Sequence, residues 1–145
     1  MNISQQDYQS LVNKASPKST LAKDCLCAFL SGGLICVLGQ ALTDTFQFAA
    51  GQSLDNARCL TSISLIFAAA LFTVFGWYGK LAKVSGAGTL VPITGFSNAI
   101  VSPAMEFRSE GLIMGVGAKM FLIAGPVIVY GTLASILYGF LLCLG

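Results

Sequence analysis

Residues 59–79 read CLTSISLIFAAALFTVFGWYG, a stretch of 21 residues without a charge. At about 1.5 Å of rise per residue, a helix of this length crosses the roughly 30 Å hydrocarbon layer of a bilayer. The stretch ends in Trp77 and Tyr78, which favour the membrane–water interface, and Lys80 and Lys83 follow at once. This pattern predicts a transmembrane helix and a function that is carried out in or across a membrane.

The composition of the whole chain agrees with this prediction. Hydrophobic residues make up 55% of the 145 residues and charged residues only 10%, with a mean hydropathy of +0.79. Soluble domains carry about 25% charged residues. We therefore expect an all-α, polytopic helical membrane protein with about four membrane segments. The net charge of +2 without a basic run argues against nucleic acid as a partner.

The sequence offers no pattern that is typical of catalysis or metal binding. It has five cysteines and no histidine, and the cysteines lack the paired spacing of zinc sites. Histidine is also the commonest general base at neutral pH, and no Ser-His-Asp, Cys-His or paired-carboxylate arrangement is present. We expect a protein that is not an enzyme and that has no cofactor and no metal site.

The chain divides into a polar N-terminal arm, residues 1–24, and a helical membrane domain, residues 25–145. In the arm we expect a short helix over Gln5–Ala15, which Ser16-Pro17 ends. Basic residues favour the cytoplasmic side of a membrane, and five lysines lie in the arm and in residues 80–83. The N-terminus is therefore predicted to be cytoplasmic.

The membrane segments follow from the uncharged runs. The first segment is predicted over residues 25–43, a polar link over 44–58, the second segment over 59–79, and a basic turn over 80–83.

Residues 84–105 are uncharged, but three glycines, two prolines and several Ser, Thr and Asn residues interrupt them. Irregular backbone at membrane depth is tolerated only where protein buries it or a watery cavity wets it. We therefore expect the third segment to be a broken helix or a re-entrant hairpin. The break is expected near Val91-Pro92 or within Thr94–Ser97.

The remainder of the chain contains one further long apolar run. Glu106–Gly111 is a charged connection, and Gly111–Ala118 is a short apolar stretch that Lys119 closes. Met120–Leu144 is the last segment, in which Pro126 predicts a kink. If the third segment crosses the membrane, the C-terminus returns to the cytoplasm, whereas a re-entrant segment leaves it outside.

The interrupted third segment is the best candidate for a functional site. Its glycines allow a half-helix whose free N–H groups face an anion or a cavity. The alternative is a kinked structural helix whose Ser and Thr side chains bond to their own carbonyls. The candidates for lining a pore or binding a substrate are Gly86, Gly88, Thr89, Pro92, Thr94, Gly95, Ser97 and Asn98.

A second group of polar and charged residues lies at the predicted edges of the membrane segments. These residues are candidates for a gate or for contacts between subunits. The alternatives are an ordinary solvated loop and a lysine that reaches the headgroups. The group consists of Gln40, Glu106, Arg108, Glu110 and Lys119.

Small residues recur every four positions in the first and last apolar runs. On a helix they form one stripe, which lets membrane helices approach each other closely. Either another helix of the same chain or a partner subunit fills such a stripe. The candidates for helix packing are Gly32, Gly131, Ser135 and Gly139.

Three motifs resemble those of a known family. Residues 29–36 (FLSGGLIC), 86–98 (GAGTLVPITGFSN) and 106–112 (EFRSEGL) are similar to the stage V sporulation AC/AEB membrane protein family. The last of these motifs resembles the AC branch rather than the AEB branch. The resemblance runs from about Ala28 to Gly139, and the glycine–proline motif is its specific part.

The resemblance implies an integral protein of the forespore and spore inner membrane. In that membrane the cytoplasmic N-terminus predicted from the lysines would lie on the spore-core side. It further implies a homo-oligomer or a hetero-complex with sister stage V sporulation A proteins, surrounded by membrane lipid. Such a complex moves dipicolinic acid, with Ca²⁺, into the developing spore and releases it in germination, through a channel that responds to tension. The alternative is a non-conducting scaffold that recruits the sister subunits. A secondary transporter is a third option, which the lack of inverted repeats and of a coupling carboxylate disfavours.

Overall fold

The computed structural model describes residues 5–15 and 20–144, and every element within them is helical. Helix α1 (Gln5–Ala15) has the predicted bounds, whereas its predicted end at Ser16-Pro17 lies outside the described residues. The long helices are α2 (Leu21–Asp44), α3 (Leu54–Val74) and α7 (Ala118–Leu144). The shorter elements are α4 (Trp77–Ser85), α5 (Ala87–Leu90), α6 (Ile93–Glu106), the π-helices η1 (Thr45–Ala49) and η3 (Leu112–Gly117), and the 3₁₀ turn η2 (Arg108–Glu110).

Within residues 5–15 and 20–144, three helical stretches are long and apolar enough to cross a membrane: Leu21–Ala49, Leu54–Val74 and Leu112–Leu144. The first includes η1 after α2, and the last includes η3 before α7. The predicted all-α membrane fold is confirmed by these stretches. The third predicted segment is not among them, because it is divided between the end of α4, α5 and α6.

Burial within the chain is the reverse of that in a soluble protein. Among the described residues, buried side chains are mostly small or polar, whereas large apolar side chains such as Phe29 and Leu137 are more than 60% exposed. This arrangement suits a bilayer, since hydrocarbon solvates the large side chains and small residues let helices approach each other. Besides Gly88, Gly95 and Gly115, the buried residues are Ala57, Ala69, Tyr78, Ala124, Thr43, Thr61, Ser85, Thr89, Thr94 and Ser97.

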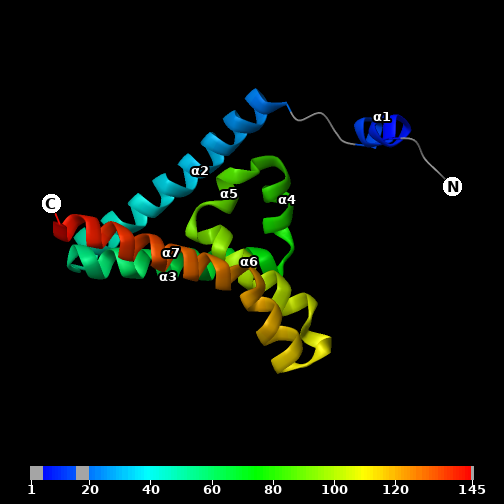
Figure 1. Cartoon of the computed structure of the whole chain (residues 1–145). Coiled ribbons are helices and arrows are strands. Elements are labelled where there is room, and N and C mark those ends of the chain that lie inside the picture. Colours follow the sequence, from blue (N-terminus) through cyan, green and yellow to red (C-terminus); the bar gives the residue numbers. More distant parts are fainter. Residues whose placement is uncertain (1–4, 16–19, 145) are drawn as a thin grey trace.

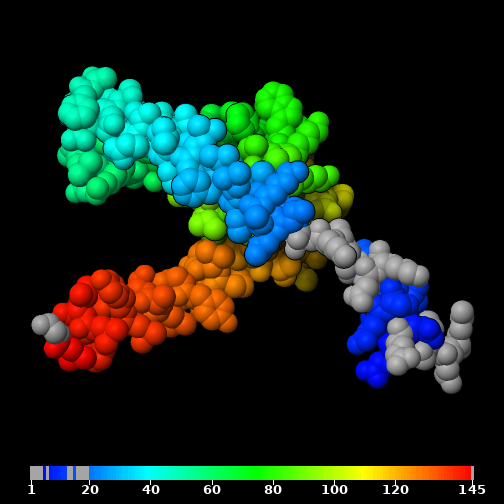
Figure 2. Space-filling view, turned by 90° about the horizontal axis from the view of Figure 1, so that it is seen from above, coloured from blue at the N-terminus to red at the C-terminus, as the bar shows by residue number. Residues whose placement is uncertain are grey.

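The long helices surround the broken segment. α6 packs against α3 and α7, and α5 packs against α2. In Figure 1 the green α4 and α5 lie in the angle between α2 and α3. α7 overlaps α3 in that view, but Figure 2 shows the red C-terminal part of α7 standing apart from α2 and α3. The first part of α7 therefore packs on the core of the chain, and its last part does not.

The third segment breaks at a glycine and at a proline. Gly86 has φ +52°, a conformation that favours glycine, and it separates α4 from α5. Pro92 is extended and precedes α6, where the absence of its N–H costs no helical hydrogen bond. The predicted break at Val91-Pro92 is confirmed, whereas the alternative position, Thr94–Ser97, is helical.

Several predicted boundaries were wrong. α2 begins at Leu21, and helical structure continues through η1 to Ala49, so only four residues remain of the predicted link over 44–58 before α3 begins at Leu54. Ser53 supports this early start, because its hydroxyl accepts from the N–H of Asn56 at 3.5 Å. The division of the chain into an arm and a membrane domain stays a prediction.

The predicted end of the second segment was also wrong. α3 ends at Val74, because Gly76 adopts the left-handed conformation (φ +71°) that terminates helices. Trp77 and Tyr78 therefore begin α4, and the predicted basic turn over 80–83 lies inside that helix.

Lys119 was expected to end a separate short apolar stretch, and this prediction was wrong. It lies in α7, which continues from η3 without interruption. Pro126 also lies within α7, and Figure 1 shows that this long helical stretch changes direction along its length.

Candidate functional site

A cavity of about 460 Å³ lies between the broken segment and α7. No charged side chain lines it, and its polar groups come from tyrosine, threonine, asparagine and serine. This neutral lining offers hydrogen bonds without selecting strongly for either sign of charge. The lining residues are Tyr78, Ala82, Gly86, Thr89, Leu90, Gly95, Asn98, Ala99, Ser102, Pro103 and Ile123.

Tyr78 ties the three pieces of the broken segment together. Its side chain is only 4% exposed, and its hydroxyl donates to the carbonyl oxygen of Thr89 at 2.7 Å. The same hydroxyl lies 3.1 Å from Oγ1 of Thr94. Tyr78 thus joins α4 to α5 and α6. The sequence analysis interpreted Tyr78 and Trp77 as interfacial residues; Tyr78 is buried within the chain, whereas Trp77 is 57% exposed.

Asn98 is positioned by the neighbouring helix α3. Oγ1 of Thr73 lies 3.0 Å from Oδ1 of Asn98 and 2.7 Å from the carbonyl oxygen of Ala69. This contact holds one end of the Asn98 amide. The other end of the amide is then the group with which Asn98 can hydrogen-bond a solute in the cavity.

The turn between α5 and α6 requires glycine at position 95. A Cβ atom there would collide with the carbonyl oxygens of Thr89 and Leu90. The backbone of α6 therefore lies directly against the end of α5, and the hydroxyl of Thr89 donates to the carbonyl oxygen of Gly86 at 3.1 Å. The cavity wall is built from tightly packed backbone at this point.

The predicted pore-lining residues occupy three different environments. Gly86, Thr89, Gly95 and Asn98 line the cavity described above. Thr94 and Ser97 are buried in helix contacts, and the Ser97 hydroxyl donates to the carbonyl oxygen of Ile66 on α3 at 2.9 Å. Gly88 and Pro92 line a second, apolar groove against α2.

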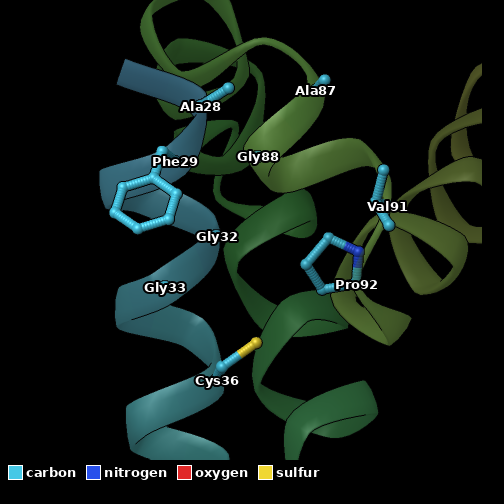
Figure 3. A pocket seen from close by; sticks show the side chains of 9 residues that line it. All are labelled: Ala28, Phe29, Gly32, Gly33, Cys36, Ala87, Gly88, Val91 and Pro92. Carbon is cyan, nitrogen blue, oxygen red and sulfur yellow. The ribbon is translucent and has the colours of Figure 1, made fainter. Parts of the chain in front are cut away.

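This second groove has a volume of about 330 Å³ and is shown in Figure 3. At its upper end α5 crosses α2 closely: a Cβ atom on Gly88 would collide with the carbonyl oxygen of Ala28. Gly32, a predicted packing residue, lies at the same crossing, where its Cβ would be 3.3 Å from the oxygen of Gly88. The groove is lined by Ala28, Phe29, Gly32, Gly33, Cys36, Ala87, Gly88, Val91 and Pro92.

The predicted gate residues do not come together in one site. Gln40 donates to the Asp44 carboxylate at 2.7 Å near the end of α2, whereas the charged residues at 106, 108 and 110 are exposed around the end of α6. Lys119 Nζ lies 4.5 Å from the centre of the Phe107 ring, a favourable cation–π position. None of the predicted gate residues lines the cavity.

The predicted packing stripe on α7 is open within this chain. A Cβ atom on Gly131 or Gly139 would meet nothing within 4 Å. Gly131 and Ser135 are exposed, and the Ser135 hydroxyl donates to the carbonyl oxygen of Gly131 in its own helix at 2.8 Å. No other helix of the described chain fills this stripe.

Sequence reasoning missed several residues that line the cavity. The sequence analysis did not single out Ser102 and Pro103, near the end of the third predicted segment, or Ile123 in the last one. The prolines gave a partial signal, since Pro103 marks a second interruption of the apolar run. Tyr78 gave none, because its partners Thr89 and Thr94 are 11 and 16 residues away.

The comparisons with known proteins agree with the resemblance found in the sequence. Residues 24–141 match the model of the SpoVAC/SpoVAEB sporulation membrane protein family. Over 134 residues the chain is 41% identical to stage V sporulation protein AC of Bacillus subtilis (strain 168), a match that covers 92% of this chain and 89% of that protein. No solved structure matches the chain. The chain belongs to the SpoVAC/SpoVAEB family of sporulation membrane proteins.

Proposed function

We propose that this chain is a subunit of a spore inner-membrane channel that moves dipicolinic acid, with Ca²⁺, into the forespore and releases it in germination when membrane tension rises. The observation that carries this proposal is the neutral, hydrogen-bonding cavity of about 460 Å³ beside the broken third segment. Irregular backbone at membrane depth is retained where it lines a cavity. The sporulation family supplies the biological setting.

The chemistry of the solute suits the lining. Dipicolinate is a dianion and Ca²⁺ is a dication, so a complex of the two is close to neutral. A fixed charge in the path would hold one ion and repel the other, whereas uncharged groups replace hydration without trapping either. Asn98 and Ser102 are the two polar lining side chains that keep a donor for a solute. The hydroxyls of Tyr78 and Thr89 already donate to carbonyl oxygens of the chain.

Helix dipoles contribute less than the sequence analysis expected. α5 has only four residues, so it cannot build the aligned peptide dipoles of a longer helix. The path therefore depends on side chains of α6, which has 14 residues, rather than on an anion site at the start of α5.

A single chain provides only part of a conduit. Its last helix has an open stripe at Gly131, Ser135 and Gly139, and small residues of this kind drive the association of membrane helices. We propose that this face assembles with a second copy or with sister stage V sporulation A proteins. The same observation supports the second candidate function, a scaffold that recruits sister subunits and conducts nothing.

The orientation proposed from the sequence places the N-terminus on the spore-core side. Lys23 in the first turn of α2 and Lys80 and Lys83 in α4 support this orientation, since all three are exposed and basic residues favour the cytoplasmic side.

Release of solute from vesicles tests the channel. Vesicles that hold the purified chain are loaded with the calcium complex of dipicolinate, and release after osmotic downshift is followed by the luminescence of external Tb³⁺. We expect release from the unmodified protein. Asn98→Leu and Ser102→Leu should each slow it by about tenfold, the equivalent of one lost hydrogen bond. Ser64→Leu is the control and should release normally, because Ser64 does not line the cavity and its hydroxyl donates to the carbonyl oxygen of Leu60 in its own helix, α3.

The outcomes separate the two candidate functions. Normal release by both cavity variants, at equal insertion, excludes the cavity as the path. Vesicles that stay closed with this chain alone but release when sister proteins are added support shared formation of the channel. The chain is a scaffold if it binds sister proteins, and if vesicles that hold those sister proteins release solute equally with the unmodified chain and with its cavity variants.

A further inference from the structure

The apolar groove between α2 and α5 is separate from the neutral cavity. Figure 3 shows the Cys36 side chain of α2 and the Pro92 ring pointing toward each other across it, with Phe29 and Val91 at its two sides. We propose that this groove binds one acyl chain of an anionic phospholipid, with the headgroup at the end near Ala28 and Ala87. The groove can hold lipid whether or not the chain conducts a solute.

The lining has the chemistry of a hydrocarbon site. Its residues are alanine, glycine, valine, proline and phenylalanine, with the Cys36 thiol as the one weakly polar group. Phe29 and Val91 at its rim are 76% and 83% exposed. Because α2 belongs to a stretch long enough to cross the membrane, hydrocarbon is the medium that meets this surface.

The size of the groove favours an acyl chain over a helix. Ala28 and Cys36 are eight residues apart on α2, which is about 12 Å along the helix axis. A helix with side chains is about 10 Å wide and would fill roughly 900 Å³ over that length. The groove holds about 330 Å³, which suits an unbranched chain.

Charge identifies the end that receives the headgroup. Ala28 and Gly88 mark one end, where α5 crosses α2. Lys23 precedes Ala28 by five residues and Lys83 precedes Ala87 by four, and both lysines are exposed.

One acidic residue, Asp24, lies beside Lys23 in the first turn of α2. The net charge of Lys23, Lys83 and Asp24 at this end of the groove is therefore still positive. At the other end, the five residues that follow Cys36 and the five that follow Pro92 include no charged side chain. A phospholipid with a negative headgroup matches this polarity along the groove.

The test uses the native cysteines of the full-length chain in nonionic detergent. Alkylation of Cys36 by a maleimide is measured by mass spectrometry while dioleoyl phosphatidylglycerol is added. We expect Cys36 to be protected at least threefold, with saturation near one lipid per chain. Cys143, exposed near the end of α7, should change little. Phosphatidylcholine should need about tenfold higher concentration, because it lacks the net negative charge that two lysines attract.

A groove-filling variant provides the matched control. Gly33 has open space where a Cβ would stand, so Gly33→Leu fills the groove without a backbone collision. Gly125→Leu adds the same side chain at an equally open position of α7. The lipid-dependent protection of Cys36 should be lost in Gly33→Leu and retained in Gly125→Leu.

Four results would overturn the assignment. Equal protection of Cys36 and Cys143 shows only general coating by lipid, as does full protection in Gly33→Leu. Protection that rises with protein concentration in the absence of lipid assigns the groove to a second chain. Protection of Cys36 by phosphatidylcholine and phosphatidylglycerol at equal concentrations would show that the lysines do not select an anionic headgroup.

Discussion

Glycines in the broken segment and glycines in the last helix occupy opposite environments. At Gly88 and Gly95 an added Cβ atom would collide with backbone oxygens, whereas at Gly131 and Gly139 it would meet nothing within 4 Å. One set of glycines is used for contacts inside the chain. The other set is left open on a helix whose C-terminal part stands apart from the bundle (Figure 2).

Glycine therefore has two different roles in this chain, although the sequence alone does not distinguish them. Close packing in the middle fixes the shape of the cavity and of the groove. The open stripe on α7 leaves a face for another membrane helix, since lipid gives no hydrophobic drive and small residues supply the close contact. Substitutions in the two regions should therefore change different properties.

The largest effect is expected from a methyl group added in the broken segment. Gly95→Ala places a Cβ against the oxygens of Thr89 and Leu90, and overpacking of this kind costs about 1–3 kcal/mol. The midpoint of thermal unfolding in detergent should fall. Gly79→Ala in α4 is the control, because nothing lies within 4 Å of its added Cβ. Equal midpoints for the two variants would contradict the close packing at Gly95.

The long apolar helices and the break in the third segment could be predicted from the sequence, whereas contacts between segments could not. The three long apolar stretches and the break at Pro92 follow from composition and from the missing N–H of proline. The end of α3 was missed, because hydropathy does not register the left-handed conformation of Gly76. The true start of α4 was missed for the same reason.

The candidate site was predicted in outline only. The stretch over 86–98 supplies much of the cavity wall, but two of its predicted lining residues, Thr94 and Ser97, are buried in contacts with other helices. Which residue of a helix faces a cavity depends on the helix packed against it. A single sequence does not contain that information for Ile123 or Ser102.

The second effect concerns assembly rather than stability. Gly131→Leu combined with Gly139→Leu should leave the unfolding midpoint unchanged, because a Cβ atom added at either position meets nothing within 4 Å. The dissociation constant for self-association or for sister subunits should rise about tenfold or more.

Analytical ultracentrifugation and co-purification measure this change. Ala134→Leu is the control, since it adds a similar side chain about 100° around the helix from Ser135. An unfolding midpoint that falls in the double variant would show that the stripe packs inside the chain after all.

A third test compares one hydroxyl in each region. Tyr78→Phe removes the bond to the Thr89 carbonyl, a loss of about 1 kcal/mol in the free energy of unfolding. Tyr138 on α7 is 65% exposed, so Tyr138→Phe should change nothing. The unfolding midpoints of the two variants provide the comparison. A Tyr78→Phe protein as stable as the unmodified one would mean that the three pieces of the broken segment hold together without this bond.

The smallest effect is expected where a hydroxyl joins two long helices. Oγ1 of Thr43 on α2 and Oγ1 of Thr61 on α3 lie 2.9 Å apart and both residues are buried. Hydrogen bonds between membrane helices contribute about 0.6 kcal/mol on average, because the unfolded chain in the membrane also finds partners. Thr61→Val should therefore lower the free energy of unfolding by about that amount.

The matched change on α7 is Thr132→Val. The hydroxyl of Thr132 donates to the carbonyl oxygen of Ile128 in its own helix at 2.7 Å, so its loss breaks no contact between helices. Reversible unfolding in mixed micelles is sensitive enough to compare the two variants. If Thr43→Val and Thr61→Val together cost twice as much as either alone, the two hydroxyls act independently and do not link α2 to α3. If the double variant costs no more than one substitution, the bond between them is the interaction that both changes remove.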